Sequence, residues 1–279
     1  MWTLPPQELG DLDQALDRAL TLVNGTAVYA LSAAERTAIH VVYQLYEVLA
    51  GQPHADLTPA TLNVARPPLY FAYDQVQVGG RLVSLRERIL ASTNQCPYCG
   101  FGEPRDLDHY LPRSVFGELA IYPRNLIPSC SPCNNAKRTV VPGLGQASGS
   151  SLIHAYFQEL PDVEFLRANV AFEGGTLQVS YWIEAELIGG ALAAKLQFQL
   201  DRLKLNDRYK GQINKFLSEQ RAAILMFHEI GSAMFSEYLV RCAGSLANSF
   251  GLNDWRPALL RALARNPDFC GSPAEYLGQ

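Results

Sequence analysis

Apolar residues recur every three or four positions through much of the first ninety residues, which is the spacing of one buried face of an α-helix. The first series is Leu9, Leu12, Leu16, Leu20 and Val23, and a later one is Leu82, Leu85, Ile89 and Leu90. Between them, Ser32 and Glu35 have the spacing of a capping box and predict the start of a helix that ends at Gly51. The Pro-rich stretch from Gln52 to Tyr70 predicts an extended loop. Residues 1–81 are therefore expected to form an N-terminal helical region.

The pattern changes in the second half of the chain. The stretch "VAFEGGTLQVSYWI" alternates around Gly174-Gly175, which predicts a β-hairpin. Helical spacing returns from Leu192 to Leu225 and from Ile230 to Leu246, and a last helix is predicted from Asp254 to about Asn266. The Gly- and Ser-rich "VPGLGQASGSS" predicts a loop before this part. Residues 151–279 are thus expected to form a hairpin followed by helices.

The chain has 279 residues, of which 48% are hydrophobic and 18% are charged, so it can bury the core of one or two domains. Its net charge of −4 argues against a protein that coats nucleic acid non-specifically, because that mode requires many neutralised phosphates. From Arg81 to Arg138, however, eight Lys and Arg stand against five Asp and Glu. The sequence shows no secretory leader pattern. It also has no apolar run as long as the about 18 residues of a membrane span, so a cytoplasmic location is expected.

Four of the six cysteines form two C-x-x-C pairs, Cys96 with Cys99 and Cys130 with Cys133. Tetrahedral zinc accepts four thiolates, and a site closed by four protein ligands is structural rather than catalytic. The two pairs therefore predict one structural zinc site, with redox chemistry or chance pairing as the alternatives. Cys242 and Cys270 stand apart in apolar helical sequence and are expected to be buried, unliganded thiols.

The sequence between and after the two pairs predicts a strand, a second strand and a helix, in "DLDHYLP", "IYPRNLIPSC" and "CNNAK". This region resembles the HNH nucleases, whose ββα-metal fold carries an Asp-His pair on the first strand, an Asn near the second, and an Asn or His on the helix. The resemblance covers about Cys96 to Arg138 and includes "DHYLPRS", "NLIPSC" and "CNNAK". It implies an α+β, mainly helical protein with an embedded, zinc-stabilised HNH module at residues 82–140.

The resemblance places the catalytic site at Asp108, His109, Asn125 and Asn134. His109 would be the general base, because a histidine pKa of about 6.5 permits proton transfer near neutral pH. Asp108 and Asn134 would supply oxygen ligands to a catalytic Mg²⁺ or Mn²⁺, which are hard cations. The resemblance implies that Asn125 holds the connecting loop and the imidazole in place, while zinc fixes the strand and the helix.

Simpler interpretations exist for each of these residues. An Asp-His pair on a strand is usually a surface pair, Asn125 alone could be a turn residue, and Asn134 alone could be a helix N-cap. Asp106 shares a strand face with Asp108, and a solvated carboxylate is the simpler interpretation of it than a metal ligand.

Three basic residues, Arg113, Lys137 and Arg138, are predicted to contact DNA phosphates, with scattered surface charge as the ordinary alternative. The stretch "IHAYF" at residues 153–157 is similar to a His-Pro-Tyr-Phe-Asp element of some bacterial HNH proteins, but Ala155 and Gln158 depart from it. No catalytic role is assigned to His154.

The resulting prediction is a metal-dependent endonuclease that hydrolyses DNA phosphodiester bonds. The resemblance implies a role in bacterial defence or in a mobile element, and an ATPase partner protein is a further expectation from nucleases with large helical flanks. Two alternatives remain at this point. One is a non-catalytic zinc module that binds nucleic acid or protein, and the other is a ribonuclease, because phosphodiester chemistry does not by itself exclude RNA.

Overall fold

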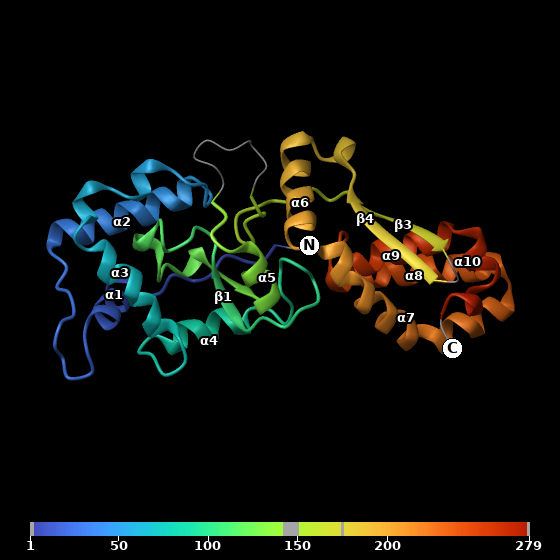
Figure 1. Ribbon diagram of the computed structural model, residues 1–279, viewed down its shortest axis with the longest axis horizontal. Coiled ribbons are helices and arrows are strands. Elements are labelled where there is room, and N and C mark those ends of the chain that lie inside the picture. Colours follow the sequence, from blue (N-terminus) through green and yellow to red (C-terminus); the bar gives the residue numbers. More distant parts are fainter. Residues whose placement is uncertain (1–2, 142–150, 174–175, 278–279) are drawn as a thin grey trace. The chain divides into compact units, whose positions relative to one another are not determined.

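The computed structural model describes residues 3–141, 151–173 and 176–277. The chain divides into two compact units. Of the described residues, the N-terminal unit comprises 3–98 and those from 102 to 159, and the C-terminal unit comprises 99–101 and those from 160 onward. In the described part of the chain, helices dominate and the strands form two separate two-stranded sheets, which confirms the predicted α+β, mainly helical fold (Figure 1).

Four helices precede the first strand of the N-terminal unit: α1 (Leu12–Leu20), α2 (Ala33–Val48), α3 (Arg66–Ala72) and α4 (Val83–Ala91). The capping box at the start of α2 is confirmed, since Ser32 accepts a hydrogen bond from the Glu35 amide and Glu35 accepts one from the Ser32 amide. Helix α1 is shorter than predicted, because Asp11 caps it and the chain leaves helical geometry at Thr21.

The prediction of an extended loop from Gln52 to Tyr70 is wrong in part. Helix α3 begins at Arg66, and its prolines stand in the first turn, where a backbone N–H has no partner within the helix. Two single turns of 3₁₀-helix precede it, Ala55–Leu57 and Ala60–Leu62.

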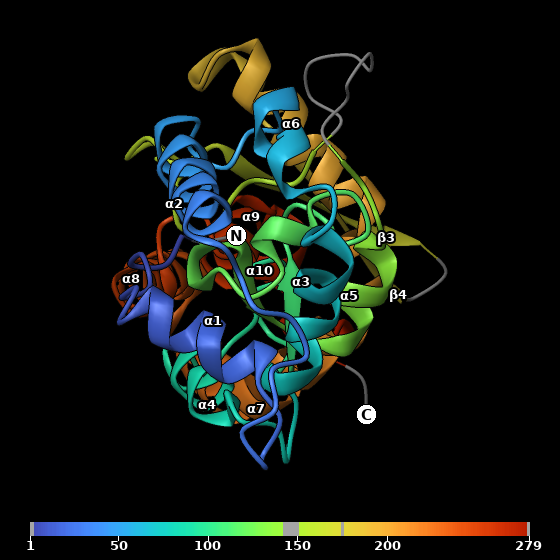
Figure 2. The ribbon, with the colours of Figure 1, turned by 90° about the vertical axis from the view of Figure 1, so that its left-hand side faces the viewer.

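The predicted order of strand, strand and helix is confirmed. Strands β1 (Asp106–His109) and β2 (Leu126–Ser129) pair antiparallel, with Asp108 opposite Ile127 and His109 opposite Leu126, and α5 (Ser131–Lys137) follows directly. Two four-residue strands cannot be stable alone in water. Helix α4 packs on both strands, and α5 packs on β1. Figure 2 looks onto α1, α2 and α3, with the strand of β1 behind them.

The C-terminal unit contains the second sheet and the remaining helices: β3 (Leu166–Glu173), β4 (Thr176–Ile183), α6 (Gly190–Arg202), α7 (Leu205–Ile230), α8 (Ser232–Phe250), α9 (Trp255–Arg265) and α10 (Pro267–Gly271). The predicted hairpin is confirmed, although its turn at Gly174-Gly175 lies outside the described residues. The stretch predicted as helical from Leu192 to Leu225 is two helices, because Lys204 adopts a left-handed conformation with φ of 50° between them.

The predicted loop "VPGLGQASGSS" lies mostly outside the described residues. The division into functional regions at residues 1–81, 82–140 and 151–279 stays a prediction.

None of the helices in the described part of the chain combines the length and the apolar character needed to cross a membrane.

Candidate active site and metal centre

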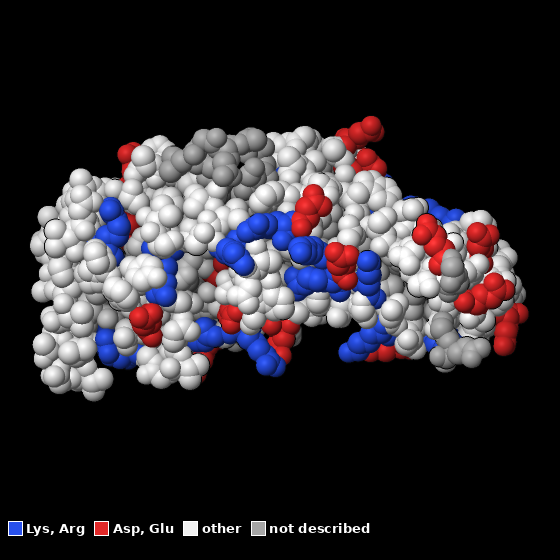
Figure 3. Space-filling view, viewed as in Figure 1, with Lys and Arg blue, Asp and Glu red and all other residues white. Residues whose placement is uncertain are grey.

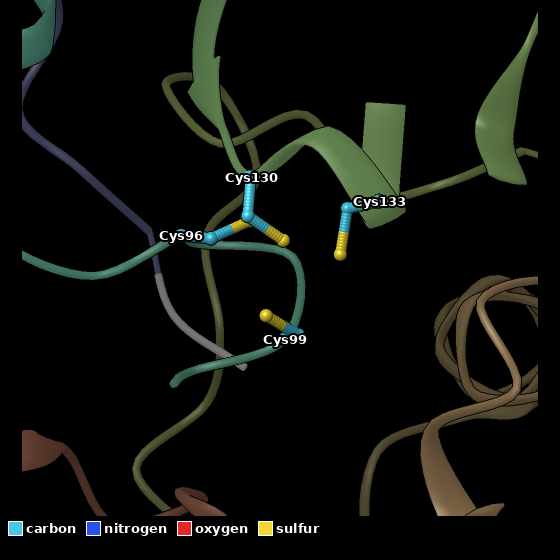
Figure 4. A group of neighbouring side chains, drawn as sticks. All are labelled: Cys96, Cys99, Cys130 and Cys133. Atoms are coloured by element: carbon cyan, nitrogen blue, oxygen red, sulfur yellow. The ribbon is translucent and has the colours of Figure 1, made fainter. Parts of the chain in front are cut away.

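The four cysteines of the two C-x-x-C pairs come together as one buried group. Their sulfur atoms all lie within 4.8 Å of one another, and their side chains point toward a common centre (Figure 4). In the part of the chain that the structure describes, this is the only such group of three or more His, Cys, Asp and Glu side chains. Four sulfurs at this separation fit a tetrahedral ion with Zn–S bonds of about 2.3 Å, so the cluster is a candidate zinc site.

Local backbone structure explains why the cysteines converge. The Cys96 amide donates a hydrogen bond to the Gly102 carbonyl at 2.7 Å, which closes the first loop, and Gly100 has φ of 73°, a conformation that favours glycine. Cys130 is the N-cap of α5 and Cys133 lies in its first turn, so both sulfurs come from one helix start. Cys242 and Cys270 lie in α8 and α10 and are not part of the cluster.

An open cavity of about 660 Å³ lies beside the ββα element in the N-terminal unit. All four residues of β1 line it, together with side chains from α3, α5 and the loops that follow β1 and α5. Its chemically active lining residues are Asp106, Asp108, His109, Asn134, Arg86, Arg113 and Arg138. In Figure 3, Lys and Arg side chains lie around the positions of α4 and α5, with Asp and Glu among them. The structure therefore brings three of the four predicted catalytic residues, Asp108, His109 and Asn134, into one cavity.

The imidazole of His109 is held in one tautomer. Its Nε2 lies 2.8 Å from the Ala120 carbonyl oxygen, and a carbonyl can only accept, so Nε2 carries the hydrogen and Nδ1 carries the lone pair. The ring also packs against Tyr73, with centroids 4.3 Å apart. The pKa of His109 is lowered to about 3, mainly by burial and to a smaller extent by the positive charges of Arg113 and Lys137, while the hydrogen bond to Ala120 acts in the opposite direction. The imidazole is therefore neutral at neutral pH.

The Asp108 carboxylate is 3% exposed and is held by two donors. The Tyr98 hydroxyl donates a hydrogen bond to Oδ2 at 2.7 Å, and Lys137 Nζ lies 3.0 Å from each carboxylate oxygen. Burial raises the pKa of Asp108, and the ammonium of Lys137 and the hydroxyl of Tyr98 oppose that rise. A carboxylate has about four lone pairs, so these two donors leave acceptor capacity on a residue that lines the cavity.

Asn134 lies beside Asp106 at the start of the cavity wall formed by α5. Its Nδ2 is 3.3 Å from Asp106 Oδ2, so the amide nitrogen is directed to Asp106 and the amide oxygen remains as an acceptor. Asp106 is partly exposed and its carboxylate contacts Asn134, so whether it is a solvated carboxylate or assists a metal stays open.

Asn125 does not line the cavity. It is fully buried, and its Oδ1 accepts hydrogen bonds from the Leu111 amide at 2.8 Å and from the Tyr46 hydroxyl at 3.0 Å. Its Nδ2 donates to the carbonyl oxygens of Leu111 at 3.0 Å and Leu119 at 3.2 Å. Asn125 thus ties both ends of the segment between β1 and β2, which carries the Ala120 carbonyl that holds His109.

His154 lies behind Asn125 and reaches it through Tyr46. Its Nδ1 accepts from the Tyr156 amide, so Nε2 carries the hydrogen and donates to the Tyr46 hydroxyl at 2.9 Å. Burial lowers the pKa of His154 to about 3. Gly51 packs so closely against this ring that an added Cβ would lie 2.4 Å from His154 Cδ2. These contacts make His154 part of the packing that orders Asn125.

The three predicted phosphate contacts differ in their surroundings. Arg113 lines the cavity, with its guanidinium 4.3 Å and 4.8 Å from the ring centroids of Tyr70 and Tyr73 and an ion pair to Asp74. Arg138 also lines the cavity. Lys137 is only 2% exposed, and it bonds to Asp108 and to the His109 carbonyl at 2.6 Å. The phosphate contact of Lys137 stays a prediction, and in this structure its ammonium is directed at the Asp108 carboxylate.

Sequence reasoning missed Tyr98 and Tyr73. Tyr73 packs on His109 and donates a hydrogen bond to the Leu107 carbonyl at 2.9 Å. Tyr98 stands inside the first cysteine pair, and its short separation from Asp108 along the chain is the one signal that could have indicated a contact. Tyr73 gives no such signal, because it comes from a distant segment.

Comparison with known proteins agrees with this geometry. Residues 96–139 match the family model of the HNH endonuclease, so the chain carries an HNH endonuclease domain there. Among curated proteins, Protein ea31 of Escherichia phage lambda is 26% identical over 203 residues, which cover 66% of this chain. The chain likewise spans 66% of the length of that relative. No solved structure matches the chain.

Proposed function

We propose that the HNH domain at residues 96–139 makes this chain a metal-dependent endonuclease that hydrolyses DNA phosphodiester bonds. One observation carries the proposal: a neutral histidine of fixed tautomer, a carboxylate and an amide oxygen line the same cavity. Phosphodiester hydrolysis requires a proton acceptor for the attacking water and positive charge near the phosphate oxygens. The cavity offers a residue for each of these needs.

Asp108 and Asn134 fit a hard divalent cation by the chemistry of their donor atoms. A carboxylate and an amide oxygen suit Mg²⁺ or Mn²⁺, which keep several waters and bind through few protein ligands. Such an ion would neutralise the charge that develops on the phosphate oxygens during hydrolysis. The contact from Asn134 to Asp106 keeps the amide nitrogen away from this position.

His109 is the general base in this proposal. Its Nδ1 accepts a proton from the attacking water, and its Nε2–H stays on the Ala120 carbonyl throughout. The bound phosphate raises the pKa of His109 from its low value, because nearby negative charge favours the imidazolium. Asn125 contributes indirectly, since it ties the segment that presents the Ala120 carbonyl.

Arg113 and Arg138 supply the positive charge that receives the DNA backbone. The guanidinium of Arg113 lies over the rings of Tyr70 and Tyr73, so it loses little side-chain freedom when it binds a phosphate. Phosphate contacts carry no sequence information directly, and cleavage by this site need not be sequence-specific. Zinc at the four cysteines would fix the loop before β1 and the start of α5.

The remaining expectations belong to the same proposal. We expect a role in bacterial defence or in a mobile element and action beside an ATPase partner protein. We also expect the nuclease module to extend over residues 82–140 between two mainly helical regions. The non-catalytic zinc module is disfavoured by the neutral His109 next to Asp108 in the cavity, which binding alone does not require.

The test uses the full chain with supercoiled plasmid, single-stranded DNA and RNA as parallel substrates. We expect plasmid cleavage in Mg²⁺ or Mn²⁺, loss of cleavage on chelation, and recovery when excess Mg²⁺ is added. Binding of plasmid without cleavage in any divalent metal would support the zinc module instead. Cleavage of RNA with intact plasmid would support the ribonuclease.

A further inference from the structure

A tyrosine inside the first cysteine pair connects the metal cluster to the Asp108 carboxylate. Tyr98 stands between Cys96 and Cys99 and is 1% exposed, and its hydroxyl donates a hydrogen bond to Asp108 Oδ2 at 2.7 Å. Both neighbouring cysteines contribute sulfurs to the four-cysteine cluster (Figure 4). The backbone that carries Tyr98 is therefore held on both sides by the candidate zinc ligands.

The two donors to Asp108 constrain it in different ways. Lys137 Nζ lies 3.0 Å from Oδ1 and 3.0 Å from Oδ2, so the ammonium attracts the carboxylate without distinguishing its two oxygens. Tyr98 contacts Oδ2, which fixes the rotation of the carboxylate and leaves Oδ1 without a hydroxyl donor. The hydrogen bond from Tyr98 thus determines which oxygen Asp108 presents.

We propose that Tyr98 is a positioning residue that couples the structural zinc cluster to the binding of the catalytic ion by Asp108. The inference rests on the proposed function, in which Asp108 is a ligand of that ion. Groups that orient a metal ligand typically change metal affinity or activity by about 10–100-fold when they are removed. The sign of the change in metal affinity is informative. Removing the Tyr98 hydroxyl makes the Asp108 carboxylate more basic, and this would strengthen metal binding if the orientation of the carboxylate did not matter.

The experiment compares Tyr98→Phe with the wild type in the full chain. Binding of Mn²⁺ is measured without DNA from the electron paramagnetic resonance signal of free Mn²⁺, and zinc is measured by elemental analysis. We expect Mn²⁺ binding to weaken by about 10-fold or more while zinc content is unchanged. Half-maximal plasmid cleavage should require a similarly higher Mg²⁺ concentration, with little change in the rate at saturating Mg²⁺.

Tyr156→Phe is the matched control. Tyr156 is also buried, and its hydroxyl donates to the Leu126 carbonyl at 2.9 Å, on β2 and away from the carboxylate. The Tyr156→Phe protein should lose about as much stability as Tyr98→Phe and keep the Mn²⁺ affinity of the wild type. In an Asp108→Ala background, Tyr98→Phe should have no further effect on Mn²⁺ binding, because its target is gone.

The outcomes separate this inference from the proposed function. A wild type that neither binds Mn²⁺ nor cuts plasmid would overturn the proposed function itself. If the wild type does both, unchanged or tighter Mn²⁺ binding by Tyr98→Phe would overturn the inference alone. Equal weakening in Tyr156→Phe, or loss of zinc from Tyr98→Phe, would also overturn it, because either result indicates general damage to the fold.

Discussion

Replacing Asn125 with alanine should destabilise the ββα element far more than a single surface substitution. Asn125 makes two hydrogen bonds through Oδ1 and two through Nδ2, and all four lie in the interior. Each such bond contributes about 1 kcal/mol net, and a buried amide left without an acceptor, here that of Leu111, costs about 1–3 kcal/mol. Allowing for relaxation around the smaller side chain, we expect a loss of about 3–5 kcal/mol in the free energy of local unfolding.

Hydrogen–deuterium exchange of peptides that cover β1, β2 and the segment between them measures this quantity for the N-terminal unit alone. A loss of about 3–5 kcal/mol corresponds to exchange that is about 10²–10⁴-fold faster at the most protected amides. Asn134→Ala is the control, because Asn134 is partly exposed and its side chain makes one contact, to Asp106, so exchange should change by less than about tenfold. Exchange in Asn125→Ala as slow as in this control would refute the role given to Asn125.

Two further predictions concern zinc and pH. Cys130→Ser should lose bound zinc and have a lower thermal unfolding midpoint, whereas Cys242→Ser should keep the zinc of the wild type. Elemental analysis measures the zinc and a thermal melt measures the midpoint. Full zinc occupancy in Cys130→Ser would contradict the four-cysteine site. The pKa values of His109 and His154 are about 3 in the folded protein and about 6.5 in the unfolded chain. Between about pH 6.5 and about pH 3 the unfolded chain therefore binds more protons than the folded protein. The free energy of unfolding consequently falls as the pH is lowered through this range. Urea denaturation from pH 7 to pH 4 should show this fall, and the free energy of unfolding of His154→Gln should fall less over the same range. An equal dependence on pH in this variant would contradict the burial of a neutral His154 imidazole.

The ββα element could be predicted because its determinants are local. The cysteine spacing, the Asp108-His109 pair and Asn134 all fall within about 40 residues, and the structure places the cysteines in one cluster and the other three in one cavity. The hairpin of β3 and β4 was equally accessible, because alternation of apolar residues depends on the strand alone.

The parts that could not be predicted depend on partners distant in sequence. Tyr46 is 79 residues from Asn125 and 108 residues from His154, and no periodicity reports such contacts. Lys137 resembles a surface cation in sequence, and only the fold shows that its ammonium reaches Asp108 in the interior. Helix α3 was missed because prolines usually end helices, although they are compatible with the first turn that they occupy here.

The rate of plasmid cleavage by His109→Ala tests the central claim most directly. His40→Ala is the matched control, because His40 is a partly exposed histidine on α2 that contacts Asp13 and is not among the residues that line the cavity. The account predicts that His109→Ala keeps its zinc and its DNA affinity but cleaves about 10²–10⁴-fold more slowly at every Mg²⁺ concentration, the usual contribution of a general base. Asp108→Ala and Asn134→Ala, in contrast, should recover partly in excess Mn²⁺. A folded His109→Ala protein that cleaves plasmid at the rate of the wild type and of His40→Ala would contradict the account.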